Sequence, residues 1–222
     1  MQEPKIIEVA DVEAVPVEEQ NIIFRPNTGP QTEFLAASER EVLYGGSAGG
    51  GKSYAMLADP LRYMGHPSFS GLLLRHTTEE LRELIFKSKE IYPQIWKGIK
   101  WSERKMQWEA PSGARLWMSY LDRDDDVLRY QGLAFSWIGF DELTQWSTPY
   151  AWNYMRSRLR SVAQDLPVYM RATTNPGGPG HQWVKKMFID PAPYGRKFDA
   201  TDIESGNVLS YPKGHSKAGQ AL

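Results

Sequence analysis

Eight consecutive residues in the first quarter of the chain have the types and spacing of a phosphate-binding loop: Gly46, Ser47, Ala48, Gly49, Gly50, Gly51, Lys52 and Ser53. The glycines let successive backbone N–H groups turn toward an anion with no side chain in the way. Lys52 would reach the β- and γ-phosphates of ATP, and the Ser53 hydroxyl would ligate Mg²⁺. A glycine-rich turn that binds nothing has no use for Lys-Ser at this spacing, so the pattern predicts a nucleotide site.

A second group of polar residues follows an apolar run. Phe135–Phe140 is mostly apolar and reads as a buried strand, and Asp141 and Glu142 come directly after it. In an α/β sheet, ligands bind outside the carboxyl ends of such strands. We therefore expect Asp141 in the Mg²⁺ shell and Glu142 as the general base that polarises the attacking water. Two acids after a strand are a weak signal alone, and the phosphate loop makes them a strong one.

Two further polar positions complete the candidate site. Gln31 lies upstream of the loop, and its amide could read the adenine edge because it both donates and accepts. Without the loop, a surface glutamine would be the better interpretation. Thr173, Thr174 and Asn175 follow the apolar run 166–172. Their hydroxyl and amide groups could contact the γ-phosphate or its water and respond to hydrolysis.

The elements that must position these residues alternate between strand and helix patterns. We predict an α/β fold of the P-loop NTPase type (the ASCE group, which carries a catalytic glutamate), with a central, mostly parallel sheet flanked by helices and a β-hairpin insertion. The predicted helices cover 31–37, the segment from Ser53, the segment from the capping box at Thr77, and a stripe from Trp152 to Val162. The predicted strands cover 42–44, 71–75, 105–109, 114–120, 135–140 and 166–172.

Composition restricts the class of protein. The chain has 222 residues and is 41% hydrophobic, enough for one good core. It has no cysteine, which excludes disulfides and cysteine–zinc sites, and no run approaches the ~18 apolar residues of a membrane span. The net charge is −1, of which residues 1–20 carry −5 and the rest +4. A modestly basic body is compatible with phosphate-rich partners, but the charge alone favours an ordinary soluble domain.

The order and the residues of these motifs resemble the ATPase domain of the large terminase subunit, the DNA-packaging motor of tailed bacteriophages. The resemblance covers roughly residues 22–190, and its specific features are Gly29-Pro30-Gln31, Tyr130-Gln131-Gly132 and Thr173-Thr174-Asn175. It implies ATP hydrolysis that translocates double-stranded DNA into a procapsid, in the bacterial cytoplasm during virion assembly. It also implies a homo-oligomeric ring that works with a portal protein and a small terminase subunit.

The resemblance further implies that an arginine from one subunit reaches the γ-phosphate of its neighbour, and Arg129 is our candidate. Some members of the family carry a basic residue within the phosphate loop, whereas this chain has Ser47-Ala48-Gly49-Gly50. That charge must come from elsewhere, with Arg75 and a neighbouring subunit as the two sources considered.

We expect an acidic leader over 1–21, the ATPase domain over 22–190 and a loop-rich segment over 191–222. Too few residues follow Asn175 for the RNase-H-like nuclease that forms the family's second domain, so we expect a chain trimmed to its motor domain; cleavage by another protein is the alternative. Two other functions stay open. One is a different DNA-dependent ATPase, such as a helicase or remodeller, which would usually need a second motor lobe. The other is a nucleotide-binding module that does not hydrolyse.

Overall fold

The computed structural model describes residues 22–46 and 49–191. The predicted leader 1–21, Ser47 and Ala48 of the phosphate loop, and residues 192–222 of the predicted C-terminal segment lie outside the described residues. Seven strands form one sheet: β1 (Glu41–Tyr44), β2 (Ser70–Arg75), β3 (Lys100–Ser102), β4 (Gln107–Glu109), β5 (Arg115–Tyr120), β6 (Trp137–Phe140) and β7 (Tyr169–Thr173).

The sheet is parallel over most of its width. Its strand order is β1-β7-β6-β2-β5-β4-β3, and the pairs β1–β7, β7–β6, β6–β2 and β2–β5 are parallel. The predicted hairpin is confirmed, because β4 and β5 pair antiparallel. The structure adds that β5 also pairs with β2 from Ser70↔Arg115 to Arg75↔Tyr120. The hairpin thus extends the main sheet, and β3 continues it antiparallel to β4.

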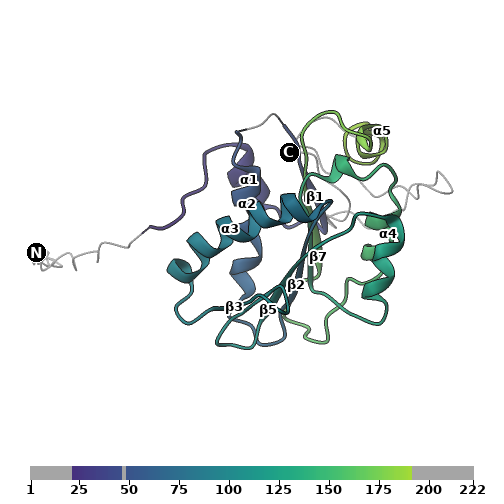
Figure 1. The fold of residues 1–222 in the computed structure, drawn as a ribbon. Coiled ribbons are helices and arrows are strands. Elements are labelled where there is room, and N and C mark those ends of the chain that lie inside the picture. Colours follow the sequence, from purple (N-terminus) through teal and green to yellow (C-terminus); the bar gives the residue numbers. More distant parts are fainter. Residues whose placement is uncertain (1–21, 47–48, 192–222) are drawn as a thin grey trace, which may run out of the picture.

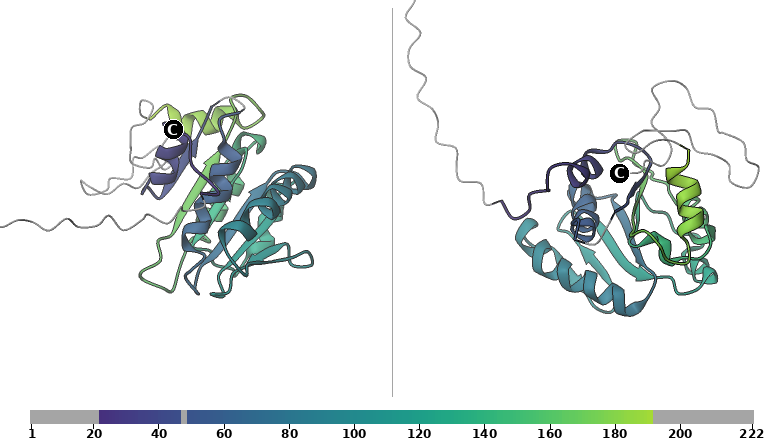
Figure 2. Two further views of the ribbon diagram at one scale, coloured as in Figure 1. Left: turned by 90° about the vertical axis from the view of Figure 1, so that its left-hand side faces the viewer. Right: turned by 90° about the horizontal axis from the view of Figure 1, so that it is seen from above.

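Helices cover both faces of this sheet. They are α1 (Pro30–Ala36), α2 (Lys52–Ala58), α3 (Thr78–Ile95), α4 (Tyr150–Arg156) and α5 (His181–Val184), with short 3₁₀ segments η1 (Asp59–Tyr63), η2 (Asp124–Tyr130) and η3 (Leu143–Gln145) and a π-helical end η4 (Lys185–Ile189). In Figures 1 and 2, α1, α2 and α3 lie on one side of the sheet, and α4 and α5 lie on the other. Among the described residues, no helix combines the length and apolar character needed to cross a membrane.

Side-chain alternation along the strands builds two cores. In β2, Leu73 packs into the core under α1–α3, whereas Leu72 and Leu74 pack into the core under α4 and α5. In β6, Trp137 faces the first core and Ile138 the second. Successive side chains of a strand point to opposite faces, so a strand that is apolar throughout must be covered on both. The continuous apolar runs of the sequence are therefore explained.

The capping box at the start of α3 is confirmed. The Thr77 hydroxyl accepts a hydrogen bond from the Glu80 N–H at 3.3 Å, and the Glu80 carboxylate accepts one from the Thr77 N–H at 3.2 Å. This box satisfies two donors that a helix start leaves unpaired. It fixes where α3 begins, directly after the β2 strand end at Arg75.

The predicted helical stripe from Trp152 to Val162 is wrong in its second half. Helix α4 ends at Arg156, and Val162 is 97% exposed. The cause is a competing backbone pairing: the Phe135 N–H donates to the Arg158 carbonyl, and the Arg160 N–H donates to the Phe135 carbonyl, both at 3.0 Å. This short bridge takes the segment out of the helix.

Candidate active site

The phosphate loop connects β1 to α2 at the carboxyl edge of the sheet. Gly49 and Gly51 have φ values of 88° and 73°, which side-chain-bearing residues rarely adopt. Lys52, the first residue of α2, is buried, and its Nζ donates to the Gly46 carbonyl at 3.0 Å. Burial lowers the pKa of Lys52, and the negative charges of Glu142 and Asp141 oppose that shift. The hydrogen bond to Gly46 thus keeps the Lys52 ammonium group at the phosphate loop, as the motif predicts.

Two side chains from outside the loop hold its carbonyl groups. Gln31 donates from Nε2 to the Gly51 carbonyl at 2.8 Å, and Tyr44 donates from its hydroxyl to the Gly50 carbonyl at 2.7 Å. The Gln31 amide oxygen accepts from the Asn27 N–H at 2.6 Å, and the side chain is only 3% exposed. The structure thus places Gln31 as a brace of the loop. Its predicted contact with adenine stays a prediction.

Asp141 is fully buried directly after β6. One carboxylate oxygen accepts a hydrogen bond from the Thr173 hydroxyl, and the other lies 3.0 Å from Nε of Arg75, at the end of β2. Burial raises the pKa of Asp141, while the Arg75 guanidinium and the Thr173 hydroxyl lower it. In this structure Arg75 therefore pairs with Asp141, and the extra positive charge considered for it at the phosphate loop stays a prediction.

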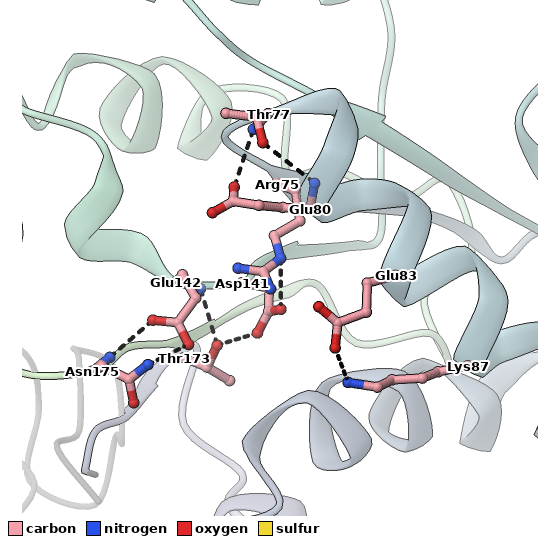
Figure 3. Close-up of polar contacts among 9 residues, drawn as sticks. All are labelled: Arg75, Thr77, Glu80, Glu83, Lys87, Asp141, Glu142, Thr173 and Asn175. Atoms are coloured by element: carbon pink, nitrogen blue, oxygen red, sulfur yellow. Dashed lines mark hydrogen bonds and ion pairs between the residues drawn. The ribbon is translucent and has the colours of Figure 1, made fainter. Parts of the chain in front are cut away.

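Glu142 has an unusual backbone conformation, and each of its carboxylate oxygens accepts a hydrogen bond. Its φ is 61°, in the left-handed region, which costs a non-glycine residue about 1–3 kcal/mol. Its oxygens accept hydrogen bonds from the Asn175 side-chain amide at 2.8 Å and the Asn175 N–H at 3.0 Å (Figure 3). Burial and the charge of Asp141 raise the pKa of Glu142. A raised pKa suits a general base that must accept a proton.

Thr173 and Thr174 link the ends of β6 and β7. The Thr173 hydroxyl, besides donating to Asp141, accepts from the Glu142 N–H at 3.1 Å. The Thr174 hydroxyl lies 2.7 Å from that of Thr144, in η3. The predicted group therefore divides: the two threonines join neighbouring strand ends, and Asn175 contacts the carboxylate of Glu142.

Two cavities share the walls formed by Glu142 and Asn175. The first, of about 310 Å³, is also lined by Gly49–Tyr54 of the loop and by Lys87 of α3. The second, of about 270 Å³, lies on the side of Arg75 and Gly177–Gly178. Glu142 thus lies between the two cavities. A water molecule bound beside its carboxylate could contact a phosphate held by the loop.

Arg129 lies away from these cavities. Its Nη2 donates to the Tyr120 carbonyl at 2.8 Å, its Nε donates to the Asp126 carbonyl at 3.2 Å, and 46% of its side chain is exposed. Neither cavity has it in its lining. A residue that serves a neighbouring subunit should not line its own site, and the role of Arg129 stays a prediction.

Sequence reasoning missed Lys87. It lies midway along α3, with Nζ 2.6 Å from the Glu83 carboxylate and 5.9 Å from the ring centroid of Tyr54. It follows the buried Leu84 and Ile85 by two or three positions, which places it beside the apolar stripe. The position beside the apolar face of α3 is the one feature of the sequence that could have pointed to Lys87. It does not indicate which part of the site that face packs against.

The donor set fits the predicted Mg²⁺. Across the described part of the chain, no three His, Asp or Glu side chains gather as a metal cluster. Mg²⁺ at phosphate sites does not need one, because it keeps several waters and takes one or two protein oxygens plus phosphate oxygens. The Ser53 hydroxyl lies in the first turn of α2, and the Asp141 carboxylate follows β6, which is separated from β1 by β7 alone.

Comparison with solved structures identifies proteins of similar fold. The large terminase of a thermophilic bacteriophage, in complex with ADP, is 16% identical, with a TM-score of 0.58 over 87% of this chain and 44% of that chain. The same phage protein in complex with ATP-gamma-S has a TM-score of 0.57 at 16% identity, over 87% of this chain and 44% of that one. The large terminase ATPase domain of Thermus phage P74-26 is 13% identical, with a TM-score of 0.57 over 89% of this chain and 81% of that chain.

The present chain thus spans less than half the length of the first of these phage terminases. No curated protein sequence matches it. The likeness to these structures confirms the predicted P-loop fold. The family model for the phage terminase large subunit matches residues 38–211, which include the phosphate loop and both acids. The chain therefore belongs to the phage terminase large subunit family, and it has the fold of that subunit's ATPase domain.

Proposed function

We propose that this chain is the ATP-hydrolysing motor domain of a DNA-packaging enzyme, with double-stranded DNA as the substrate that it moves into a procapsid. The observation that carries the proposal is the position of Glu142. Its carboxylate borders the cavity formed by the phosphate loop, opposite Lys52 and the start of α2. A carboxylate with a raised pKa, next to a triphosphate site, is what water activation for hydrolysis requires.

In the proposed reaction, the loop N–H groups and Lys52 hold the triphosphate, and Glu142 takes a proton from the water that attacks the γ-phosphate. Mg²⁺, held by Ser53 and through the Asp141 shell, would neutralise charge that develops on the phosphate oxygens. Thr173 is the last residue of β7 and hydrogen-bonds to Asp141, and Asn175 follows β7 and hydrogen-bonds to Glu142. Movement of β7 and movement of the catalytic base are thereby coupled.

The bonds between Glu142 and Asn175 support a slow basal rate. Each carboxylate oxygen already accepts one hydrogen bond from Asn175, which stabilises the deprotonated form and leaves only the remaining lone pairs to accept a proton from water. An arginine supplied by a neighbouring subunit adds ~10³-fold or more in related phosphoryl-transfer enzymes. We infer that full activity needs the homo-oligomeric ring, with Arg129 as the candidate arginine.

Family membership supports a proposal for the remaining partners. A portal protein and a small terminase subunit would complete the packaging machine in the host cytoplasm. The net positive charge of the chain outside residues 1–20 supports contact with the DNA backbone.

Two variants test the proposal. Glu142→Gln should lower ATP turnover by about 10²–10⁴-fold and leave the affinity for ATP intact, because the base is lost and the phosphate contacts remain. Lys52→Ala should weaken ATP binding itself. Phosphate release reports turnover, and calorimetric titration with ATP reports affinity.

Three outcomes would contradict the proposal. Retained hydrolysis in Glu142→Gln would show that Glu142 is not the general base. A wild-type chain that binds ATP without turnover, even at high protein concentration, would be a non-hydrolysing module. Strand separation by this protein would favour a helicase.

A further inference from the structure

A second cation borders the cavity of the phosphate loop. Lys87 comes from α3, on a different element from the loop, and lines the same 310 Å³ space as Gly49–Ser53 and Glu142. Its side chain is 27% exposed. Neither a phosphate-loop pattern nor the acidic strand end accounts for a lysine at this position, because neither motif extends to α3.

The present partner of Lys87 holds it only weakly. Glu83 lies one helical turn before it, and the Glu83 side chain is 60% exposed. Pairs of this kind change a helix equilibrium by roughly twofold at most. A triphosphate carries more negative charge than a single solvated carboxylate, so its oxygens compete favourably for the ammonium group.

The local charges create a need for this cation. Within the phosphate loop, Lys52 is the one basic residue, since Ser47-Ala48-Gly49-Gly50 carries no charge. Arg75 pairs with the buried Asp141 at 3.0 Å and does not line the 310 Å³ cavity.

We propose that Lys87 is a second triphosphate-binding residue, supplied by the same subunit, whose ammonium group leaves Glu83 and binds phosphate oxygens when ATP enters. This inference rests on the proposed function, because it assigns a further contact to the same nucleotide site. It also makes Glu83 a holding partner that keeps Lys87 beside the cavity before the nucleotide binds. The two residues therefore have opposite expected effects.

A four-variant comparison on the full chain tests the assignment. Titrations with Mg²⁺–ATP-gamma-S should show that Lys87→Met raises Kd by about tenfold or more, which corresponds to one lost charge-assisted bond. Lys87→Arg should recover part of the affinity. Glu83→Gln should leave Kd unchanged or lower, because it frees the lysine. Lys89→Met removes an equal charge from the same helix, where Lys89 pairs with Glu103, and should leave Kd unchanged.

The outcomes separate this inference from the proposed function. If Lys87→Met and Glu83→Gln weaken binding equally, Lys87 is only an ion-pair partner and the inference is wrong. It is also wrong if Lys87→Met and Lys89→Met give the same Kd. In both cases, loss of binding in Lys52→Ala would leave the nucleotide site itself established. Thermal unfolding of each variant confirms that the comparison is made on folded protein.

Discussion

Two buried arginine–aspartate pairs lie at opposite edges of the same sheet, and they are built differently. At the amino edge, Asp59 follows α2 and accepts a hydrogen bond from Trp137 at the start of β6, at 2.8 Å. It also pairs with Arg62 at 2.9 Å and with Arg171 of β7 at 3.8 Å. At the carboxyl edge, Arg75 of β2 pairs with Asp141, directly after β6.

The surroundings of the two arginines explain the difference. Arg171 donates to the carbonyl groups of Ala37, Glu39 and Met170 and stacks 4.3 Å from the Tyr169 ring centroid. This network joins α1, η1, β6 and β7 and has no cavity beside it among the two described. Arg75, by contrast, borders the 270 Å³ cavity, with Glu80 and Glu142 on the same wall. The first pair locks elements together, whereas the second lies where ligands can enter and partners can change.

The largest expected effect concerns stability. Asp59→Asn should lower the free energy of unfolding by about 3–5 kcal/mol, because it leaves the guanidinium of Arg171 buried without its counterion. Asp141→Asn should cost only about 1 kcal/mol, because burial already raises the pKa of Asp141 and other carboxylates border Arg75. Urea unfolding measures both. Equal losses would contradict the distinction between a locking pair and an exchangeable pair.

The variant with the smaller loss of stability, Asp141→Asn, should show the larger loss of ATP turnover. Asp141→Asn should abolish Mg²⁺-dependent ATP turnover, whereas Asp59→Asn should retain it at a temperature where the protein is folded. Phosphate release, together with far-UV circular dichroism on the same samples, separates loss of activity from loss of fold.

A smaller effect tests whether Gln31 braces the loop or reads the base. Gln31→Leu should raise KM for ATP and for GTP by the same factor, about tenfold, because it removes two hydrogen bonds that hold Gly51 and Asn27. Tyr44→Phe is the matched control, since it removes the other brace, at Gly50. A loss confined to ATP would show that the Gln31 amide contacts adenine after all.

The smallest expected effect is a displacement of the pH profile. Glu142 acts as a base only when deprotonated, so kcat should fall as the pH drops through its pKa. Burial and the Asp141 charge raise that pKa. The acid limb of kcat should therefore lie above the ordinary glutamate range near ~4.3. A limb within or below that range would mean that another group limits the rate. Arg75→Gln should move the limb further up, because Arg75 lowers the pKa of Glu142.

Much of the fold could be predicted because its signals are local. Glycine spacing, the capping box at Thr77 and the apolar run before Asp141 each depend on a few neighbouring residues. The wrong prediction for the second half of the 152–162 stripe has a non-local cause. Helix α4 stops early because the segment after it pairs with Phe135, more than 20 positions upstream in sequence. No local period contains that information.

What the sequence determined by itself is the chemistry at the carboxyl edge: a loop that can hold phosphates, a lysine, and two acids at the end of a buried strand. What only the tertiary structure decided is how these groups are engaged. Gln31 turns to the Gly51 carbonyl, Arg75 to Asp141, and Asn175 to both oxygens of Glu142. Lys87 enters the site because α3 packs beside the loop. The physical reason is that residue types limit which bonds are possible, whereas burial and the crossing of distant elements decide which bonds form.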